Sequence, residues 1–285
     1  MFRKFLPAIL VLSLAVMACS FNINLPTVNL TPGPTVTDDI SVPVPTGVSG
    51  SVDLSLAFGA GTLKLHSGSS QLVTGTATYN VADFKPTVSA NGSSVRVQQG
   101  NWKVTGIPSF SNIKNEWDLS LGTAPINLSI EAGAYQADYQ LGGLALTGLT
   151  VKDGAAQSKM DFTEPNAAEM SLLRYETGAS EVTLTGLGNA NFTRLEFTCG
   201  AGSYSLDFSG ALKQSGNVTI QTGISDMTLV IPRGVPAQVT VEGGLSNVTH
   251  GSNWTKNGNV YTQSGSGPQL TIDVKIGAGN LTLTD

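Results

Sequence analysis

The sequence predicts an all-β protein built as a single-stranded β-solenoid, in which one chain winds through stacked coils. Apolar and polar residues alternate with period two through most of the chain after residue 50, as they do in half-buried strands. A unit of strand, glycine-centred turn and strand also recurs, with successive centres at Gly178, Gly200, Gly223 and Gly243. These centres lie 22, 23 and 20 residues apart, a period that suits one solenoid coil.

The repeat is clearest in three segments that contain Gly-Ala-Gly between two alternating runs. They are Leu54–Leu65, Leu195–Phe208 and Thr271–Leu283, and a weaker copy centres on Gly133. We expect each central glycine to supply the positive φ that a sharp bend requires. An antiparallel sandwich with hairpins of similar length is the alternative, but the constant position of the glycine in each unit favours the solenoid.

Composition narrows the range of functions. Only 12% of the 285 residues are charged, the formal net charge is −5, and the chain has two His and two Cys. A nucleic-acid binder needs clustered Lys and Arg, so that class is excluded. Two histidines leave little material for metal or general-base chemistry, so the sequence predicts no enzyme, no metal and no cofactor.

Residues 1–18 have the organisation of a signal peptide. Arg3 and Lys4 precede a largely apolar run of 13 residues, Phe5–Met17. A helix of that length reaches about 20 Å, short of the roughly 30 Å hydrocarbon core of a bilayer. A cleaved export signal is therefore favoured over a permanent membrane span.

The end of this segment, Val16–Cys19, resembles the bacterial lipobox of an aliphatic residue, any residue, a small residue and cysteine. The resemblance implies that Cys19 carries acyl chains and becomes the first residue of the mature protein. The lipid would anchor the protein to the outer face of the cell membrane, or to the outer membrane in a bacterium with two membranes. An ordinary cleavage site that lies near a cysteine is the alternative.

Residues 19–48 are predicted to be a semi-extended tether that carries the lipidated Cys19. Five prolines between residues 26 and 45 would break any strand ladder, and no amphipathic period runs through the segment. An edge strand over residues 40–42 is a local alternative. The folded solenoid domain is expected over residues 49–285.

Two shorter elements interrupt the solenoid pattern. The stretch Pro165–Leu173, with proline near its first turn, predicts one short helix. The 34-residue step from Gly243 to Gly277 contains a predicted hairpin around Trp254–Tyr261, in which Asn257-Gly258 is a strong type I′ turn signal.

Four segments of the domain have sequence motifs that resemble those of a known family. They are Leu54–Asn80, Tyr175–Asn191, Cys199–Gly210 and Val230–Pro236. Together they resemble bacterial toast-rack domain proteins, which are related to LiaF-like cell-wall-active-antibiotic response proteins and to adhesins with β-solenoid domains. The resemblance extends over most of residues 50–285 and implies a surface β-solenoid. It brings no catalytic residues with it.

Two histidines and one cysteine are the candidates for catalysis in the domain. His66 and His250 lie at a strand end and in a turn, outside any nucleophile-elbow or zinc motif, so both are interpreted as solvated. Cys199 shares strand parity with Leu195 and Phe197, and we expect a buried, inert thiol.

Aromatic residues in the irregular parts of the pattern are the best candidates for ligand binding. Exposed rings stack on sugar rings, and the candidates for this role are Trp102, Trp117, Trp254 and Tyr261. The alternative is that they cap the open ends of the solenoid and protect them from edge pairing.

These features predict a non-enzymatic, lipid-anchored envelope protein whose solenoid is an adhesin-like interaction surface. Its expected partners are the membrane, through the lipid anchor, and an envelope glycan or a membrane protein. A regulatory module of an envelope-stress response that binds a membrane protein is the alternative, and it rests on the LiaF-like resemblance alone. A polysaccharide-acting enzyme ranks third, because it needs a carboxylate cluster on one face of the solenoid.

Overall fold

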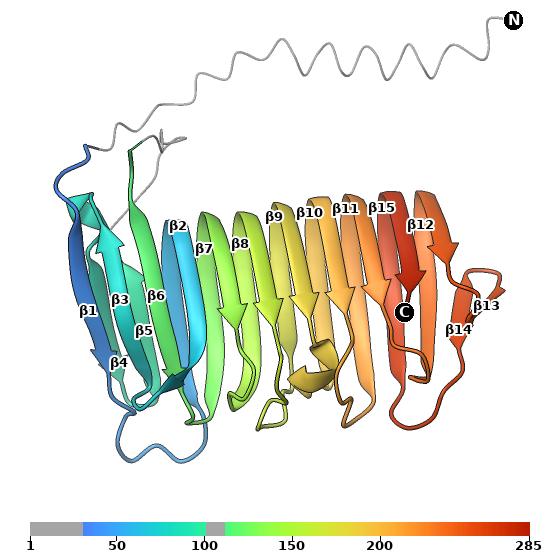
Figure 1. The fold of residues 1–285 in the computed structure, drawn as a ribbon, viewed down its shortest axis with the longest axis horizontal. Helices are drawn as coiled ribbons and strands as arrows, with labels where there is room; N and C mark the ends of the chain where they lie inside the picture. The colour runs from blue at the N-terminus through green and yellow to red at the C-terminus, as the bar shows by residue number, and fades with distance from the viewer. Residues whose placement is uncertain (1–30, 101–111) are drawn as a thin grey trace, which may run out of the picture. The chain divides into compact units, whose positions relative to one another are not determined.

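The computed structural model describes residues 31–100 and 112–285 of the chain. The described residues 32–100 and 114–285 belong to one compact unit. This unit contains a single sheet of fifteen strands (Figure 1). Nearly all of the regular secondary structure is strand, which confirms the all-β class. The sheet is open and does not close into a barrel, as expected of a solenoid-like architecture.

The strands alternate with short loops along the whole unit. In chain order they are β1 (Val36–Val42), β2 (Val52–Ser69), β3 (Val73–Tyr79), β4 (Pro86–Asn91), β5 (Ser94–Gln99), β6 (Asn115–Gly122), β7 (Ile126–Gln140), β8 (Leu146–Asp161), β9 (Leu173–Thr185), β10 (Arg194–Asp207), β11 (Gly216–Val230), β12 (Ala237–His250), β13 (Trp254–Asn257), β14 (Val260–Gln263) and β15 (Leu270–Thr284). Two short 3-10 helices, η2 (Ala82–Phe84) and η3 (Leu187–Ala190), lie in loops. In space the order is β1-β3-β6-β2-β7-β8-β9-β10-β11-β15-β12-β14-β13, and β4 attaches to β2 through β5.

Eight long strands, from β2 to β12 in this spatial order, run parallel and each makes one coil. Each strand bends near its middle, so it has a first arm before the bend and a second arm after it (Figure 1). The register aligns eight corner glycines, which are Gly59, Gly133, Gly154, Gly178, Gly200, Gly223, Gly277 and Gly244. The alternation of buried and exposed residues shifts phase at this point, so the inward side chains of both arms face one core.

Close packing between coils explains most of the corner glycines, though not Gly244 at the last coil. None of these eight residues has a positive φ, so the expectation of positive φ at the repeat centres is wrong. A Cβ on Gly178 would instead lie 2.3 Å from the carbonyl oxygen of Gly154 in the neighbouring coil. The positive φ angles occur two residues later in three coils, with 130°, 147° and 130° at Gly61, Gly202 and Gly279.

The tether predicted over residues 19–48 is too long, because Val36–Val42 forms β1. This strand pairs antiparallel with β3, and the hydroxyl of Tyr79 donates to Asp38 at 2.7 Å. Ile40 is buried in the core at 4% exposure. The edge-strand alternative is therefore correct and reaches beyond residues 40–42, so the folded domain begins before residue 49. The predicted signal peptide lies outside the described residues.

The short helix predicted over Pro165–Leu173 is wrong. Residues 165–172 form a loop, and Leu173 begins β9. The buried side chain of Asn166 accepts a hydrogen bond from the N–H of Leu146 at 2.8 Å and donates to its carbonyl at 2.7 Å. These bonds tie the loop to the neighbouring coil, and such tertiary contacts override local helix propensity.

The predicted hairpin around Trp254–Tyr261 is confirmed. β13 and β14 pair antiparallel as far as Asn257 and Val260, so Gly258 and Asn259 are the central residues of the turn. Gly258 has a φ of 61° and Asn259 has no positive φ, so the turn is of type II′, and the predicted type I′ turn at Asn257-Gly258 is wrong. β14 also pairs with Ala237–Thr240, the first residues of β12. The hairpin therefore covers the start of the first arm at this end of the sheet.

The last long strands depart from the simple order of a solenoid. β12 lies two places beyond β11, and the C-terminal β15 inserts between them, parallel to both. The register aligns Gly277 of β15 with Gly223 and Gly244. The corner of β12 is therefore Gly244, one residue after the predicted centre Gly243.

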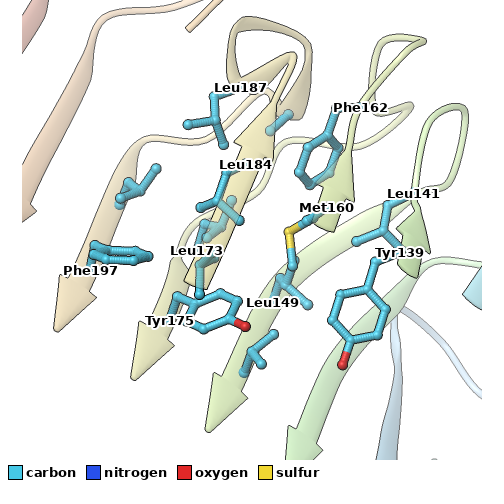
Figure 2. Packing of buried hydrophobic residues seen from close by; sticks show 14 of the residues in the cluster. Tyr139, Leu141, Leu149, Met160, Phe162, Leu173, Tyr175, Leu184, Leu187 and Phe197 are labelled. Carbon is cyan, nitrogen blue, oxygen red and sulfur yellow. The ribbon is translucent and has the colours of Figure 1, made fainter. Parts of the chain in front are cut away.

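The core lies between the two arms of the coils. Figure 2 shows inward side chains from neighbouring strands that point into the same space, among them Tyr139, Met160, Tyr175 and Phe197. These four side chains are at most 1% exposed. Burial of a large side chain stabilises a fold by about 1.5–3 kcal/mol. Such residues form rows that run from coil to coil, and these rows hold the stack together.

Candidate functional site

The outward face of the first arm carries charged side chains that pair across neighbouring strands. The guanidinium of Arg174 on β9 lies 2.6 Å from the carboxylate of Glu196 on β10. The ammonium of Lys152 on β8 lies 3.1 Å from the carboxylate of Glu176 on β9. Partly exposed pairs of this kind contribute about 0.2–1 kcal/mol each. Over β8–β10 these charged groups already satisfy one another.

The outward face of the second arm carries a column of hydroxyl groups. One aligned position on β9, β10, β11, β15 and β12 holds Thr183, Ser205, Thr228, Thr282 and Thr249. We call these five residues the hydroxyl column. Neighbouring strands lie about 4.8 Å apart, so the hydroxyls are evenly spaced. Each hydroxyl can both donate and accept a hydrogen bond, and the column can therefore bind a polar partner along its length.

A hydrogen-bonded cluster fills the inside of the corner in three middle coils. The carboxylate of Asp153 accepts hydrogen bonds from the hydroxyls of Tyr135 at 3.2 Å, Tyr175 at 3.0 Å and Thr177. Two further hydroxyls extend the network, and we define the Asp153 cluster as Tyr135, Tyr139, Asp153, Tyr175, Thr177 and Ser180. Its members come from β7, β8 and β9, so the cluster ties these coils together in register.

Burial dominates the electrostatics of the Asp153 cluster. It raises the pKa of Asp153, while the hydrogen bonds from Thr177, Tyr175 and Tyr135 act in the opposite direction. Burial also raises the pKa of Tyr135 and Tyr139 well above the usual value. The tyrosines therefore stay protonated and act as hydrogen-bond donors, which suits a structural network.

Sequence reasoning did not find the Asp153 cluster. Asp153 lies between a lysine and a corner glycine, a context that resembles a solvated turn. The signal becomes visible only when the coils are aligned on their corner glycines. The residue before the glycine is then Thr177, Cys199 or Thr222 in other coils, and all three are buried. This alignment assigns Asp153 to the interior.

The structure places three of the four candidate aromatic residues in the core. Trp117, Trp254 and Tyr261 are 1%, 5% and 2% exposed, so the expectation that they are exposed is wrong. Trp117 occupies an inward position of β6 and packs edge-on against Phe58, with ring centroids 5.3 Å apart. The other two lie on β13 and β14 at the end of the sheet, which agrees with the end-capping alternative. Strand alternation therefore decides the burial of these rings.

The two other site residues from the sequence, Trp102 and Cys19, lie outside the described residues. Within residues 31–100 and 112–285, no helix has the length and apolarity that crossing a membrane requires. Stacking by Trp102 and lipidation of Cys19 stay predictions.

The histidines and Cys199 show no catalytic arrangement in the described part of the chain. His66 Nε2 lies 3.2 Å from a carboxylate oxygen of Asp118, and His250 Nδ1 lies 3.0 Å from the carbonyl oxygen of Gly251. Cys199 is a buried free thiol, and burial raises its pKa to about 11. Such a thiol is a poor nucleophile. Across the described ranges, no group of three or more His, Cys, Asp or Glu could hold a metal ion.

A family model described as "N-terminal domain of toast_rack" matches residues 31–185 and 168–230. The chain belongs to the toast-rack family. The matched residues extend from before β1 to the end of β11. The C-terminal strands β12–β15 of this toast-rack protein lie beyond them.

Several solved structures are similar to this toast-rack protein. A "putative cell adhesion protein" from Clostridium sporogenes is 18% identical, with 88% of this chain and 99% of that chain covered and a TM-score of 0.48. A "putative adhesin" from Bacteroides fragilis is 10% identical, with 90% and 99% covered and a TM-score of 0.34. A "putative lipid binding protein" from Parabacteroides distasonis is 10% identical, with 90% and 99% covered and a TM-score of 0.38. No curated protein matches the sequence.

Proposed function

We propose that this toast-rack protein is a non-enzymatic, envelope-associated protein whose solenoid is an adhesin-like interaction surface. The hydroxyl column carries the proposal, because five aligned strands repeat the same hydrogen-bonding group on one outward face. Each coil of a solenoid adds one equivalent contact, which suits a long polar partner such as an envelope glycan. The densest group of titratable side chains, the Asp153 cluster, lies inside the corner and serves the fold.

The location of the protein follows from its N-terminus. The lipobox-like segment Val16–Cys19 supports lipidation of Cys19 and anchoring at the outer face of the cell membrane. Residues 20–35 separate Cys19 from β1. A spacer of this length lets the sheet stand away from the lipid surface and reach a partner in the envelope.

The interaction surface is tested by a binding assay with two baits. Full chain purified in detergent is offered purified envelope glycans on one resin and detergent-solubilised membrane proteins of the host on another. Retention on glycan that falls in Thr228→Lys but not in Thr150→Lys, a matched outward position on the first arm, supports the proposal. Retention by one discrete membrane protein alone would favour the regulatory alternative, and retention on neither resin contradicts both.

The anchor is tested separately in cells. Wild-type chain is expected in the membrane fraction, and Cys19→Ser chain is expected in the medium or another soluble fraction. Mass spectrometry of the N-terminal peptide should show acyl chains on Cys19 of the wild-type chain. Equal partition of both chains, or an unmodified Cys19, contradicts lipidation.

A further inference from the structure

We propose that the first arm of the last three coils carries a binding groove for an uncharged oligosaccharide. It lies across β11, β15 and β12, and its lining defines the C-terminal groove as Thr219, Gln221, Thr240, Glu242, Asp273 and Lys275. The inference rests on the proposed function, because both use outward strand faces to bind a partner. It goes further by naming a second site, on the opposite arm from the hydroxyl column, and a ligand class.

The six side chains form a regular grid on three parallel strands. Register partners give one row as Gln221, Lys275 and Glu242 and the other row as Thr219, Asp273 and Thr240. Strands lie about 4.8 Å apart, and side chains two residues apart on one face are separated by about 6.6 Å. An oligosaccharide that lies across the strands therefore meets a new pair of polar side chains at each step.

The grid is hollowed and continues over the corner. The space that its side chains line has a volume of about 290 Å³. A second, shallow depression of about 560 Å³, more open to solvent than the first, adjoins it and shares Gln221, Glu242 and Lys275. Gly243 and Gly277 also line this depression, and they have no side chains that could fill it. The hollow and the adjoining depression together offer a continuous polar surface for an oligosaccharide.

The chemistry of the groove selects the ligand class. The ammonium of Lys275 only donates hydrogen bonds, and the carboxylates of Asp273 and Glu242 only accept them. The amide of Gln221 and the threonine hydroxyls do both. Sugar hydroxyls also donate and accept, so they can satisfy every one of these groups. An anionic polymer would meet two carboxylates and one ammonium, and the net repulsion disfavours it.

The charges of the groove are less satisfied than those on the middle coils. Arg174 and Glu196 on β9 and β10 are 2.6 Å apart, whereas Lys275 and Glu242 are 3.7 Å apart. The side chains of Lys275 and Glu242 are 62% and 63% exposed. In the part of the chain that the structure describes, Asp273 takes part in no ion pair. A loosely held pair and a free carboxylate are therefore available to a ligand.

The position of the groove follows from the unusual strand order. Two of its three strands, β12 and β15, lie after residue 230, where the family match ends. The insertion of β15 between β11 and β12 brings the three outward rows together. The groove is therefore a feature that membership of the toast-rack family does not by itself bring.

Calorimetric titration of the full chain in detergent tests the groove. Cellotetraose and tetra-N-acetylchitotetraose are the uncharged probes, and tetragalacturonate is the anionic probe. At least one uncharged probe should bind, and tetragalacturonate should not. The double variant Gln221→Ala/Asp273→Asn should lower the affinity for the bound probe about tenfold or more, because it removes hydrogen bonds to a neutral and a charged group.

The matched control is Lys152→Ala/Glu176→Gln, which changes two middle-coil residues in the register row of Gln221 and should leave the affinity unchanged. Thermal unfolding of both variants establishes that they fold. The proposal is overturned if neither uncharged probe binds, if tetragalacturonate binds more tightly, or if both double variants lower the affinity equally. If one of these results is obtained and the wild-type chain is still retained on envelope glycans, the groove alone is refuted. If the wild-type chain is not retained on envelope glycans either, the proposed function is refuted as well.

Discussion

The middle coils, β7–β11, and the C-terminal coils, β12 and β15, share one repeat but differ in strand order and in how closely the last coil packs. In the middle coils the spatial order follows the chain order, and a Cβ on Gly178 would lie 2.3 Å from the carbonyl oxygen of Gly154. In the C-terminal coils a late strand is inserted. A Cβ on Gly277 of β15 would lie 2.7 Å from the carbonyl oxygen of Gly223, but a Cβ on Gly244 of β12 would lie 3.5 Å from that of Gly277. The middle coils thus form a closely packed scaffold, and the looser packing is confined to β12, one of the three strands of the groove.

Removal of β15 should have the largest effect, because it should unfold the C-terminal strands and leave the middle coils folded. Deletion of residues 270–285 takes away the strand that pairs with nearly the whole length of β12. We expect the amides of β12–β14 to lose protection in hydrogen–deuterium exchange, while those of β7–β10 keep theirs. Loss of protection throughout the sheet would show that the middle coils do not form an independent scaffold.

Alanine substitution of a corner glycine should lower stability by different amounts in the two regions. Gly178→Ala forces a Cβ against backbone that cannot move away, and we expect a loss of about 3 kcal/mol in the free energy of unfolding. Gly244→Ala meets ordinary van der Waals distances and should lose less than about 0.5 kcal/mol. Chemical denaturation of both variants measures the difference. Equal losses would contradict looser packing at the corner of β12.

The Asp153 cluster gives a prediction specific to the middle coils. Asp153→Ala leaves three buried hydroxyl donors without their acceptor, and we expect a loss of about 1–3 kcal/mol in the free energy of unfolding. Thr222→Ala, in the corresponding corner of β11, removes bonds to the hydroxyl of Ser225 and the thiol of Cys199, neither of which is a carboxyl group, and should lose less. Denaturation midpoints of the two variants provide the comparison, and the reverse order would contradict it.

The pH dependence of the free energy of unfolding tests the role of Asp153 in this cluster directly. Because the folded pKa of Asp153 is raised, folding favours the protonated carboxyl. Its contribution to stability is therefore fully present below the unfolded pKa, about 3.9, and is lost as the pH rises through the folded pKa. The free energy of unfolding of Asp153→Asn should change less than that of wild type over this range. Parallel curves for the two proteins would show that Asp153 does not titrate differently in the folded state.

The smallest expected difference concerns the outward charges. Arg174→Ala removes two contacts to neighbouring glutamates and should lose about 0.2–1 kcal/mol in the free energy of unfolding. Lys275→Ala removes one exposed pair and should have no measurable effect on stability. A larger loss for Lys275→Ala would mean that the groove charges serve the fold and are not free for a ligand.

Period-two alternation and the recurring glycine were sufficient to predict the solenoid, because both are local consequences of parallel coils. The hairpin around Gly258 was equally accessible, since turn chemistry acts over two residues, although its turn is type II′ and begins one residue later than predicted. Non-local contacts explain the errors. β1 is a strand because it pairs with β3, and the loop after residue 165 is not helical because Asn166 bonds to the neighbouring coil.

The sites were harder to predict than the fold. The rings of Trp117, Trp254 and Tyr261 are buried because of their parity on strands whose boundaries are not evident from the sequence. The C-terminal groove combines β11 with β15, 54 residues further along the chain. No local pattern reveals that β15 inserts before β12. A site that depends on this insertion therefore needs the three-dimensional structure.

The most direct test of the account is hydrogen–deuterium exchange of the full chain with and without purified envelope glycan. Glycan binding should increase protection on β11, β15 and β12, which carry the C-terminal groove and part of the hydroxyl column, and leave exchange on the scaffold strands β7 and β8 unchanged. Increased protection on β7 and β8 alone, or no change anywhere in the sheet, would contradict the account.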